Sequence, residues 1–229
     1  AYLDQIEDKE ALLHYLRQYM TEERSIRFRE VLKFRTRHFT LAVEDVFKER
    51  NASAIVRTAD CFGIQDVHII ENQNEYQISE NISKGAEKWV NVNIYDALLN
   101  NTGACISDLK NMGYQIIATS PHSSGSSPDD FDISKKSAFF LGGEKEGLTD
   151  EVLDKADGYI RIPMYGFTES YNISVAGALL LYNLTRRLNQ SEIDWELTEQ
   201  EQLELQLDWT IKTIASSENL VKKYLENIS

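Results

Sequence analysis

The chain has 229 residues, 42% hydrophobic and 27% charged, which is enough to bury one substantial core. No apolar run reaches the length of a membrane span, and two cysteines without nearby histidines argue against a disulfide framework or a zinc site. The formal net charge of −13 at first disfavours a nucleic-acid partner. The N-terminus is acidic and unlike a secretory signal, so we expect a cytoplasmic protein that binds no metal and no membrane.

Residues 1–37 are expected to form a helical N-terminal extension. Residues 24–37 hold six basic residues and one acid, a local charge of +5 in an acidic chain. One interpretation is a solvated amphipathic helix, which is the more common case. The apolar stripe of such a helix would be Ile26, Val31 and Phe34. The other interpretation, which we adopt, is a patch that contacts RNA phosphates. This patch consists of Arg24, Arg27, Arg29, Lys33, Arg35 and Arg37.

Residues 38–190 alternate between strand patterns and helix patterns. The strand patterns cover residues 39–46, 66–70, 89–95, 114–120, 137–144 and 159–164. The helix patterns cover residues 52–62, 102–113, 148–156 and 172–187. This alternation predicts an α/β domain with a parallel sheet and helices on both faces. Residues 191–229 form an acidic extension with helical spacing, which we expect to pack on the core or on a partner.

The helix predicted within residues 51–63 carries the first candidate site residue. Asn51 suits the N-cap, and Gly63 suits the position just beyond the last turn. At 100° per residue the apolar side chains share one face, and Arg57 points away from it. A solvated arginine paired with Asp60, three residues on, is the more common outcome for such a segment. The rest of the chain must decide between this outcome and a functional role.

Two strand ends carry polar or glycine-rich loops, and parallel α/β domains bind ligands beyond such ends. LGGEKEGL at 141–148 follows one strand, and its glycines allow a ligand to approach the backbone. The loop matches neither a phosphate-binding loop nor GxGxxG, which disfavours a dehydrogenase. The second loop lies within residues 162–180, where Ser170 or Asn172 could simply cap the following helix.

Taken in order, three motifs resemble a known family. They are NASAIVRTADCFG, LGGEKEGLTDEV and RIPMYGFTESYNISVAGALLLYNL. They resemble the SpoU branch of the SPOUT superfamily, the AdoMet-dependent RNA 2′-O-ribose methyltransferases. The similarity runs from about residue 21 to residue 188, and the basic region looks most like the bacterial tRNA (guanosine-2′-O)-methyltransferases that modify the D-loop. The resemblance implies a C-terminal trefoil knot, S-adenosyl-L-methionine bound in the knot loops, and a homodimer with its active site across the interface.

The resemblance also assigns site residues. The positions that match the family's catalytic residues are Asn51, Arg57, Glu144, Ser170 and Asn172. The expected cofactor-binding positions, contacted largely through the backbone, are Leu141, Gly142, Gly143, Ile162, Met164, Ser170, Tyr171, Asn172 and Ser174. One departure is visible, because the family often has leucine where this chain has Tyr171. A larger side chain there could change the shape of the cofactor pocket.

The expected role of Arg57 follows from its chemistry. A guanidinium has a pKa above about 12, which makes it a poor base, but its planar fork suits a phosphate. We therefore hypothesise that Arg57 clamps the phosphate beside the target ribose. The substrate is expected to be the D-loop guanosine of tRNA. The alternatives are the same reaction on ribosomal RNA, or a non-catalytic RNA-binding relative.

Overall fold

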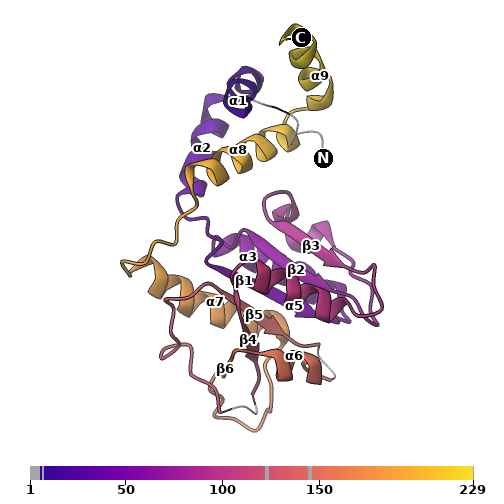
Figure 1. The fold of residues 1–229 in the computed structure, drawn as a ribbon, viewed down its shortest axis with the longest axis vertical. Coiled ribbons are helices and arrows are strands. Elements are labelled where there is room, and N and C mark those ends of the chain that lie inside the picture. The colour runs from indigo at the N-terminus through magenta and orange to yellow at the C-terminus, as the bar shows by residue number, and fades with distance from the viewer. Residues whose placement is uncertain (1–5, 7, 122–123, 144–145, 229) are drawn as a thin grey trace. The chain divides into compact units, whose positions relative to one another are not determined.

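The computed structural model describes residues 6, 8–121, 124–143 and 146–228, whose fold is shown in Figure 1. Two compact units divide the chain: residues 1–35 together with 196–229, and residues 36–195. The helices of the first unit are α1 (Lys9–Arg17), α2 (Glu22–Leu32), α8 (Glu199–Thr213) and α9 (Ser217–Ile228). The helices of the second are α3 (Glu49–Cys61), α4 (Glu80–Ser83), the 3₁₀ helix η2 (Ala86–Lys88), α5 (Asn101–Asn111), α6 (Asp150–Lys155) and α7 (Ile173–Asn189).

The second unit contains the strands β1 (Phe39–Glu44), β2 (Asp66–Ile70), β3 (Asn91–Tyr95), β4 (Gln115–Thr119), β5 (Ser137–Leu141) and β6 (Gly158–Ile160). All pairings are parallel, in the order β3-β2-β1-β5-β4-β6, which confirms the predicted parallel α/β domain. Val43 of β1 pairs with Ile69 of β2 and with Leu141 of β5. After β1 the chain continues to β2 on one side of this strand, and after β5 it continues to β6 on the other side. The strand order therefore reverses between β1 and β5, and parallel α/β sheets bind ligands beyond the carboxyl ends of the strands at such a position.

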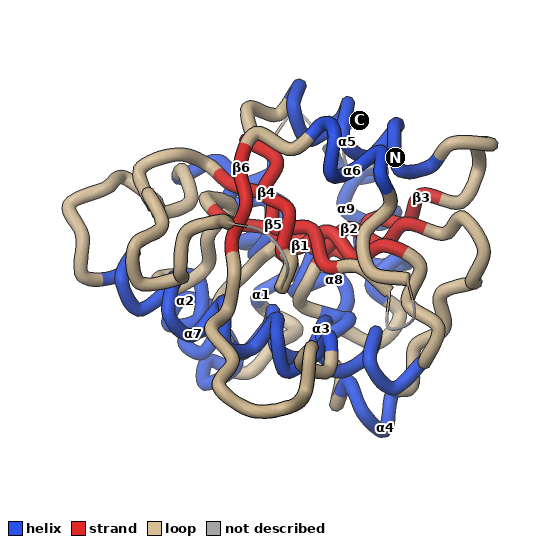
Figure 2. Tube along the Cα trace, turned by 90° about the horizontal axis from the view of Figure 1, so that it is seen from below, coloured by secondary structure: helices blue, strands red, loops and turns tan. Residues whose placement is uncertain are grey.

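Helices cover both faces of the sheet. Figure 2 shows α3 and α7 on one face and α5 and α6 on the other. The larger hydrophobic core lies under α3 and α7, and a second core lies under α5 and α6. The sequence of β1 alternates between apolar and polar residues, yet neither face of this strand is exposed, because all six of its residues are buried. A central strand covered on both faces buries even its polar residues, and Thr40 satisfies its hydroxyl by donating to Asp66 O at 2.6 Å.

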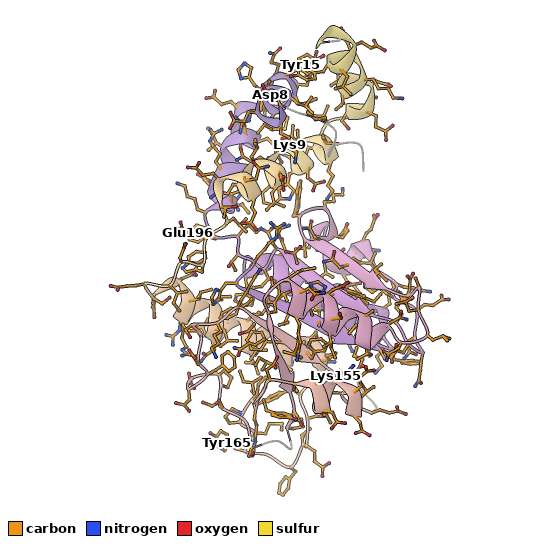
Figure 3. The ribbon with its side chains drawn as sticks, viewed as in Figure 1. Asp8, Lys9, Tyr15, Lys155, Tyr165 and Glu196 are labelled. Atoms are coloured by element: carbon orange, nitrogen blue, oxygen red, sulfur yellow. The ribbon has the colours of Figure 1, made fainter. Side chains whose placement is uncertain are left out.

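The two chain ends meet in one helical unit. Leucines of α1 pack with Leu207 of α8 and Val221 of α9. The acidic segment after residue 190 therefore packs on the N-terminal helices. Figure 3 labels Asp8 and Lys9 at the N-terminus of α1 and Tyr15 in its last turn, and Asp8 caps the helix by accepting from Ala11 N at 2.8 Å. Lys9 forms an ion pair with Glu204 at 2.7 Å, which adds a link between α1 and α8.

The apolar face of α2 was predicted incorrectly. Phe28 and Leu32, four residues apart, are the buried residues of this helix. Ile26 and Phe34 are 41% and 64% exposed, so the stripe that they were expected to form with Val31 does not face the core. Phe28 instead packs edge-on against the ring of a tryptophan in α8, with ring centroids 5.4 Å apart. The contact between α2 and α8 thus determines which face of α2 is buried. The sequence of α2 alone does not show this contact.

The helix of the first motif begins earlier than predicted. α3 starts at Glu49, with Lys48 at the N-cap, so Asn51 lies in the first turn and not at the cap. Its end is as predicted, because Gly63 has a φ of 74° and its N–H bonds to Asp60 O. Within the described residues, no helix is long and apolar enough to cross a lipid bilayer.

Candidate active site

Three glycines shape the loop that follows β5. Gly147 N donates to Gly143 O at 3.0 Å, and Gly147 has a φ of 72°. A Cβ atom on Gly142 would lie 2.1 Å from the carbonyl carbon of Gly147, and one on Gly143 would lie 2.7 Å from Asp45 O. Positions 142 and 143 therefore need glycine, which leaves their backbone groups uncovered by side chains. Glu144, the predicted acidic site residue, lies outside the described residues.

The second loop connects β6 to α7 and contains neither helix nor strand from residue 161 to residue 172. Ile162 packs against the larger core, and Met164 is half-buried. Ser170 is exposed, and Tyr171 donates from Oη to Pro163 O at 3.0 Å, so this larger side chain stabilises the loop. Figure 3 labels Tyr165 on the same loop, where its side chain is 97% exposed.

Asn172 caps α7, as the simpler interpretation of its motif predicted. Its Oδ1 accepts from Ser174 N at 3.0 Å and from Ser174 Oγ at 2.7 Å. Its Nδ2 donates to Oδ1 of Asn51 at 3.2 Å. The structure thus brings together two predicted site residues that lie 121 positions apart in the sequence.

Close packing of α7 on the sheet makes this contact possible. Gly177 is buried, and a Cβ atom there would lie 3.4 Å from Leu141 Cδ1. Gly177 thus faces Leu141 of β5 and Leu41 of β1 at ordinary van der Waals distance, and α7 packs on the sheet within its own chain.

Arg57 lies on the exposed side of α3. Within the described part of the chain, its hydrogen bond goes from Nη1 to Ile82 O of α4, at a long 3.5 Å. Arg57 therefore keeps most of its donors directed at solvent, although its own chain does not place it in contact with Ser170 or Asn172.

The predicted basic patch is only partly available. Four of its members are exposed: Arg24, Arg27, Arg29 and Lys33. Arg27 forms a weak surface ion pair with Glu30 at 3.5 Å. Arg35 is 2% exposed, with its guanidinium 5.4 Å from the ring centre of Trp209, and its burial corrects the expectation that it contacts RNA directly. Arg37 is half-buried and bonds Asp66 at 2.8 Å, so its charge is already matched.

Sequence reasoning missed two acids at the carboxyl end of β1, Glu44 and Asp45. Glu44 is 1% exposed, and Asp45 has a left-handed φ of 49° beside the Gly143 loop. A signal for them was present, because two acids directly follow an apolar strand at the edge where ligands bind. Their hydrogen bonds are described below.

The two cysteines differ in environment. Cys105 is buried, and burial raises the pKa of its thiol, whereas Cys61 is exposed. The described residues contain no group of three or more histidine, cysteine or carboxylate side chains placed to hold a metal ion.

A parallel α/β sheet with a glycine loop and a polar loop beyond its carboxyl edge defines a ligand-binding α/β domain. This chain belongs to the SpoU rRNA methylase family, whose model matches residues 38–182. The resemblance drawn from the three motifs is thereby confirmed.

Individual relatives are similar over most of the chain. A protein of Borreliella burgdorferi named tRNA (guanosine(18)-2′-O)-methyltransferase is 41% identical over 90% of this chain and 94% of its own length. The Escherichia coli K12 protein of the same name is 36% identical over 73% of this chain and 72% of its own. The crystal structure of a TrmH/SpoU tRNA modifying enzyme from A. aeolicus is 31% identical, with a TM-score of 0.74 over 85% of this chain and 98% of that one.

A more distant structure shares the fold. It is the SpoU methyltransferase AviRb from Streptomyces viridochromogenes in complex with the cofactor AdoMet, which is 18% identical. Its TM-score is 0.59 over 71% of this chain and 65% of that one.

Proposed function

We propose that this chain transfers a methyl group from S-adenosyl-L-methionine to the 2′-hydroxyl of a guanosine in the D-loop of tRNA. Family membership and the names of relatives that match nearly the whole chain support the proposal. The observation that carries it is the Asn51–Asn172 contact, which joins the first and third motifs beside the glycine loop of the second. The same reaction on ribosomal RNA is the alternative substrate assignment.

The residues present fit a nucleoside cofactor held through backbone groups. The irregular loop from residue 161 to residue 172 forms no helix or strand, so its backbone N–H and C=O groups could serve such a ligand, and Gly142 and Gly143 have no side chain between their backbone and the ligand. The residues that would hold it are Leu141, Gly142, Gly143, Ile162, Met164, Tyr171 and Ser174, together with Ser170 and Asn172. When bound, S-adenosyl-L-methionine supplies an electrophilic methyl group on a sulfonium.

Arg57 would bind and orient the RNA. Its free N–H groups suit a bidentate contact to the phosphate beside the target ribose, which would stabilise negative charge as the hydroxyl loses its proton. The proton would leave to that phosphate or to water, because a guanidinium does not accept it. Asn51, fixed by Asn172, and Ser170 would orient the ribose, and Asn172 would hold the loop over the cofactor. Glu144 remains a proposed site residue.

A homodimer fits the exposed face of α7. Three large side chains at helical spacing lie there, 41 to 60% exposed, and they are Val175, Leu179 and Tyr182. The ring of Tyr182 contacts that of Phe62 at the end of α3, with centroids 6.4 Å apart, so this apolar face reaches the helix that carries Arg57. An interface on this face would let Arg57 of one subunit serve the site of the other.

The exposed arginines and lysine of α2 are the proposed contacts to tRNA phosphates, on the helical extension formed by the chain ends. The trefoil knot of the domain from residue 38 to residue 190 stays a prediction of the resemblance. The site of action would be the cytoplasm, where tRNA is modified.

The decisive experiment is methylation of unmodified tRNA with labelled S-adenosyl-L-methionine, followed by nuclease mapping of the label. We expect the label in a D-loop guanosine. Cleavage that requires a free 2′-hydroxyl should then fail at this nucleotide. Ribosomal RNA is tested in a parallel reaction, and label in ribosomal RNA alone would favour the alternative substrate. Absence of both transfer and cofactor binding in calorimetry would indicate a non-catalytic relative.

A further inference from the structure

Glu44 ends the central strand β1 as a buried carboxylate at the edge of the sheet. It is 1% exposed, and hydrogen bonds from described residues stabilise its carboxylate. Oε1 accepts from Thr102 Oγ1 at 2.5 Å and from Thr149 Oγ1 at 2.9 Å. Oε2 accepts from Thr149 N at 2.9 Å. Burial of a carboxylate is unfavourable without such partners, so the site is built around this group.

Thr149 shows what the carboxylate holds. It occupies the N-cap of α6, where a threonine side chain ordinarily accepts from its own helix, but no such bond is present here. Both its hydroxyl and its N–H are directed at Glu44 instead. Thr149 follows Gly147 and Leu148, whose backbone packs on Gly142. Glu44 therefore anchors the returning half of the glycine loop, while β5 anchors the outgoing half through its pairing with β1.

The neighbouring residues extend this anchor to a second loop. Asp45 Oδ1 accepts from Asn72 N at 2.9 Å and from Gln73 N at 2.8 Å, and the Asp45 carbonyl oxygen lies against Gly143. Asn72 Nδ2 donates to Thr102 Oγ1 at 2.9 Å, so the hydroxyl that bonds Glu44 is itself fixed. The loops after β1, β2 and β5 thus form one hydrogen-bonded network at the edge where the ligand site lies.

We propose that Glu44 is a positioning residue that fixes Gly147 and Thr149 against Gly142, and that it thereby sets the affinity for the cofactor and not the rate of the chemical step. The inference rests on the proposed function only for the identity of the cofactor. A displaced loop no longer holds its backbone N–H and C=O groups within hydrogen-bond distance of a bound ligand, so the affinity falls.

The test compares Glu44→Ala, Glu44→Gln and a matched control, Thr40→Val. Thr40 is buried in the same strand and donates to Asp66 O, but it lies at the opposite end of β1 from the glycine loop. All three substitutions remove or alter a buried polar group, so a purely structural effect would lower thermal stability in each. Three quantities are measured: hydrogen exchange of residues 146–153 without cofactor, the Kd for S-adenosyl-L-methionine by calorimetry, and kcat with KM on tRNA.

Glu44→Ala is expected to speed exchange in residues 146–153 and to raise the Kd and KM for S-adenosyl-L-methionine by about tenfold or more. Its kcat at saturating cofactor should stay within about threefold of wild type. Glu44→Gln should recover most of the affinity, because its amide oxygen can accept from Thr149 N while its NH₂ donates to the two hydroxyls. Thr40→Val should leave exchange and Kd unchanged.

The positioning role would be overturned if Glu44→Ala changed exchange and Kd no more than Thr40→Val does, or if it lowered kcat while leaving Kd at the wild-type value. A wild-type chain that failed to bind S-adenosyl-L-methionine would refute the proposed function instead. In that case the exchange comparison alone decides whether Glu44 fixes the loop.

Discussion

Replacing Gly142 with alanine is expected to displace the loop after β5 and weaken cofactor binding. The added Cβ would lie 2.1 Å from the carbonyl carbon of Gly147 and 2.2 Å from Leu148 N. Ordinary carbon contacts are about 3.5 Å, so one of the two backbone segments must move by about 1.4 Å. A shift of this size takes backbone groups out of hydrogen-bond reach of the ligand, and the loss of one or two such bonds, at about 1 kcal/mol each, lowers the affinity about 5- to 30-fold.

The assay is calorimetric titration of S-adenosyl-L-methionine into the wild type, Gly142→Ala and the control Gly166→Ala. Gly166 also lies in a loop at this edge, but nothing is within 4 Å of the Cβ that alanine would add there. The control should therefore bind as the wild type does, and thermal unfolding should show that both variants fold. If Gly142→Ala bound within about threefold of wild type, the tight glycine contact would not matter for the cofactor, and the assignment of this loop would fail.

Three further predictions concern other parts of the second unit. Arg57→Lys keeps the charge but loses the planar fork, so kcat should fall by about tenfold or more with unchanged cofactor affinity, and near wild-type turnover would contradict the phosphate clamp. Leu179→Arg places a charge in the exposed face of α7 and should convert a dimer to monomers in sedimentation; a persistent dimer would exclude this face as the interface. Burial lowers the pKa of His68, so below about pH 6.5 the unfolded chain binds a proton that the folded chain does not. The free energy of unfolding should then fall with decreasing pH, by at most about 1.4 kcal/mol per pH unit from this ring, and His68→Gln should flatten the slope unless another group causes it.

The order of the strands and of α3, α5, α6 and α7 could be predicted from the sequence because each of these elements has a strong local pattern, whereas the short helices α4 and η2 were missed. The C-terminal ends of α3 and α5 could also be predicted, because each is followed by a glycine with a positive φ, Gly63 and Gly113. The start of α3 was not, because Asn51 suits an N-cap chemically but is instead buried against α7. A tertiary hydrogen bond thus outweighed a local preference of about 1 kcal/mol.

The helical unit shows a second limit of local reasoning. Residues 191–229 were expected to be helical, but only the structure shows that Leu207 and Val221 of this segment pack with α1. Partners so distant in the sequence leave no trace in either segment's own pattern. Arg35 illustrates the consequence, because its charge suggested a phosphate contact, whereas Trp209, far along the chain, covers its guanidinium.

The spacing of Asn51 and Arg57 in the first motif places their side chains on different sides of α3. Arg57 lies six positions after Asn51, which at 100° per residue leaves the two side chains about 120° apart around the helix, with a rise of about 9 Å. One position can therefore be buried against α7 while the other stays in solvent, as their exposures show. A spacing of seven would have brought both to nearly the same face, and the arginine would have faced the core. The exposed guanidinium is thus a consequence of the same helix geometry that ties the first motif to the third, and it leaves a phosphate-binding group beside an apolar face suited to a second subunit.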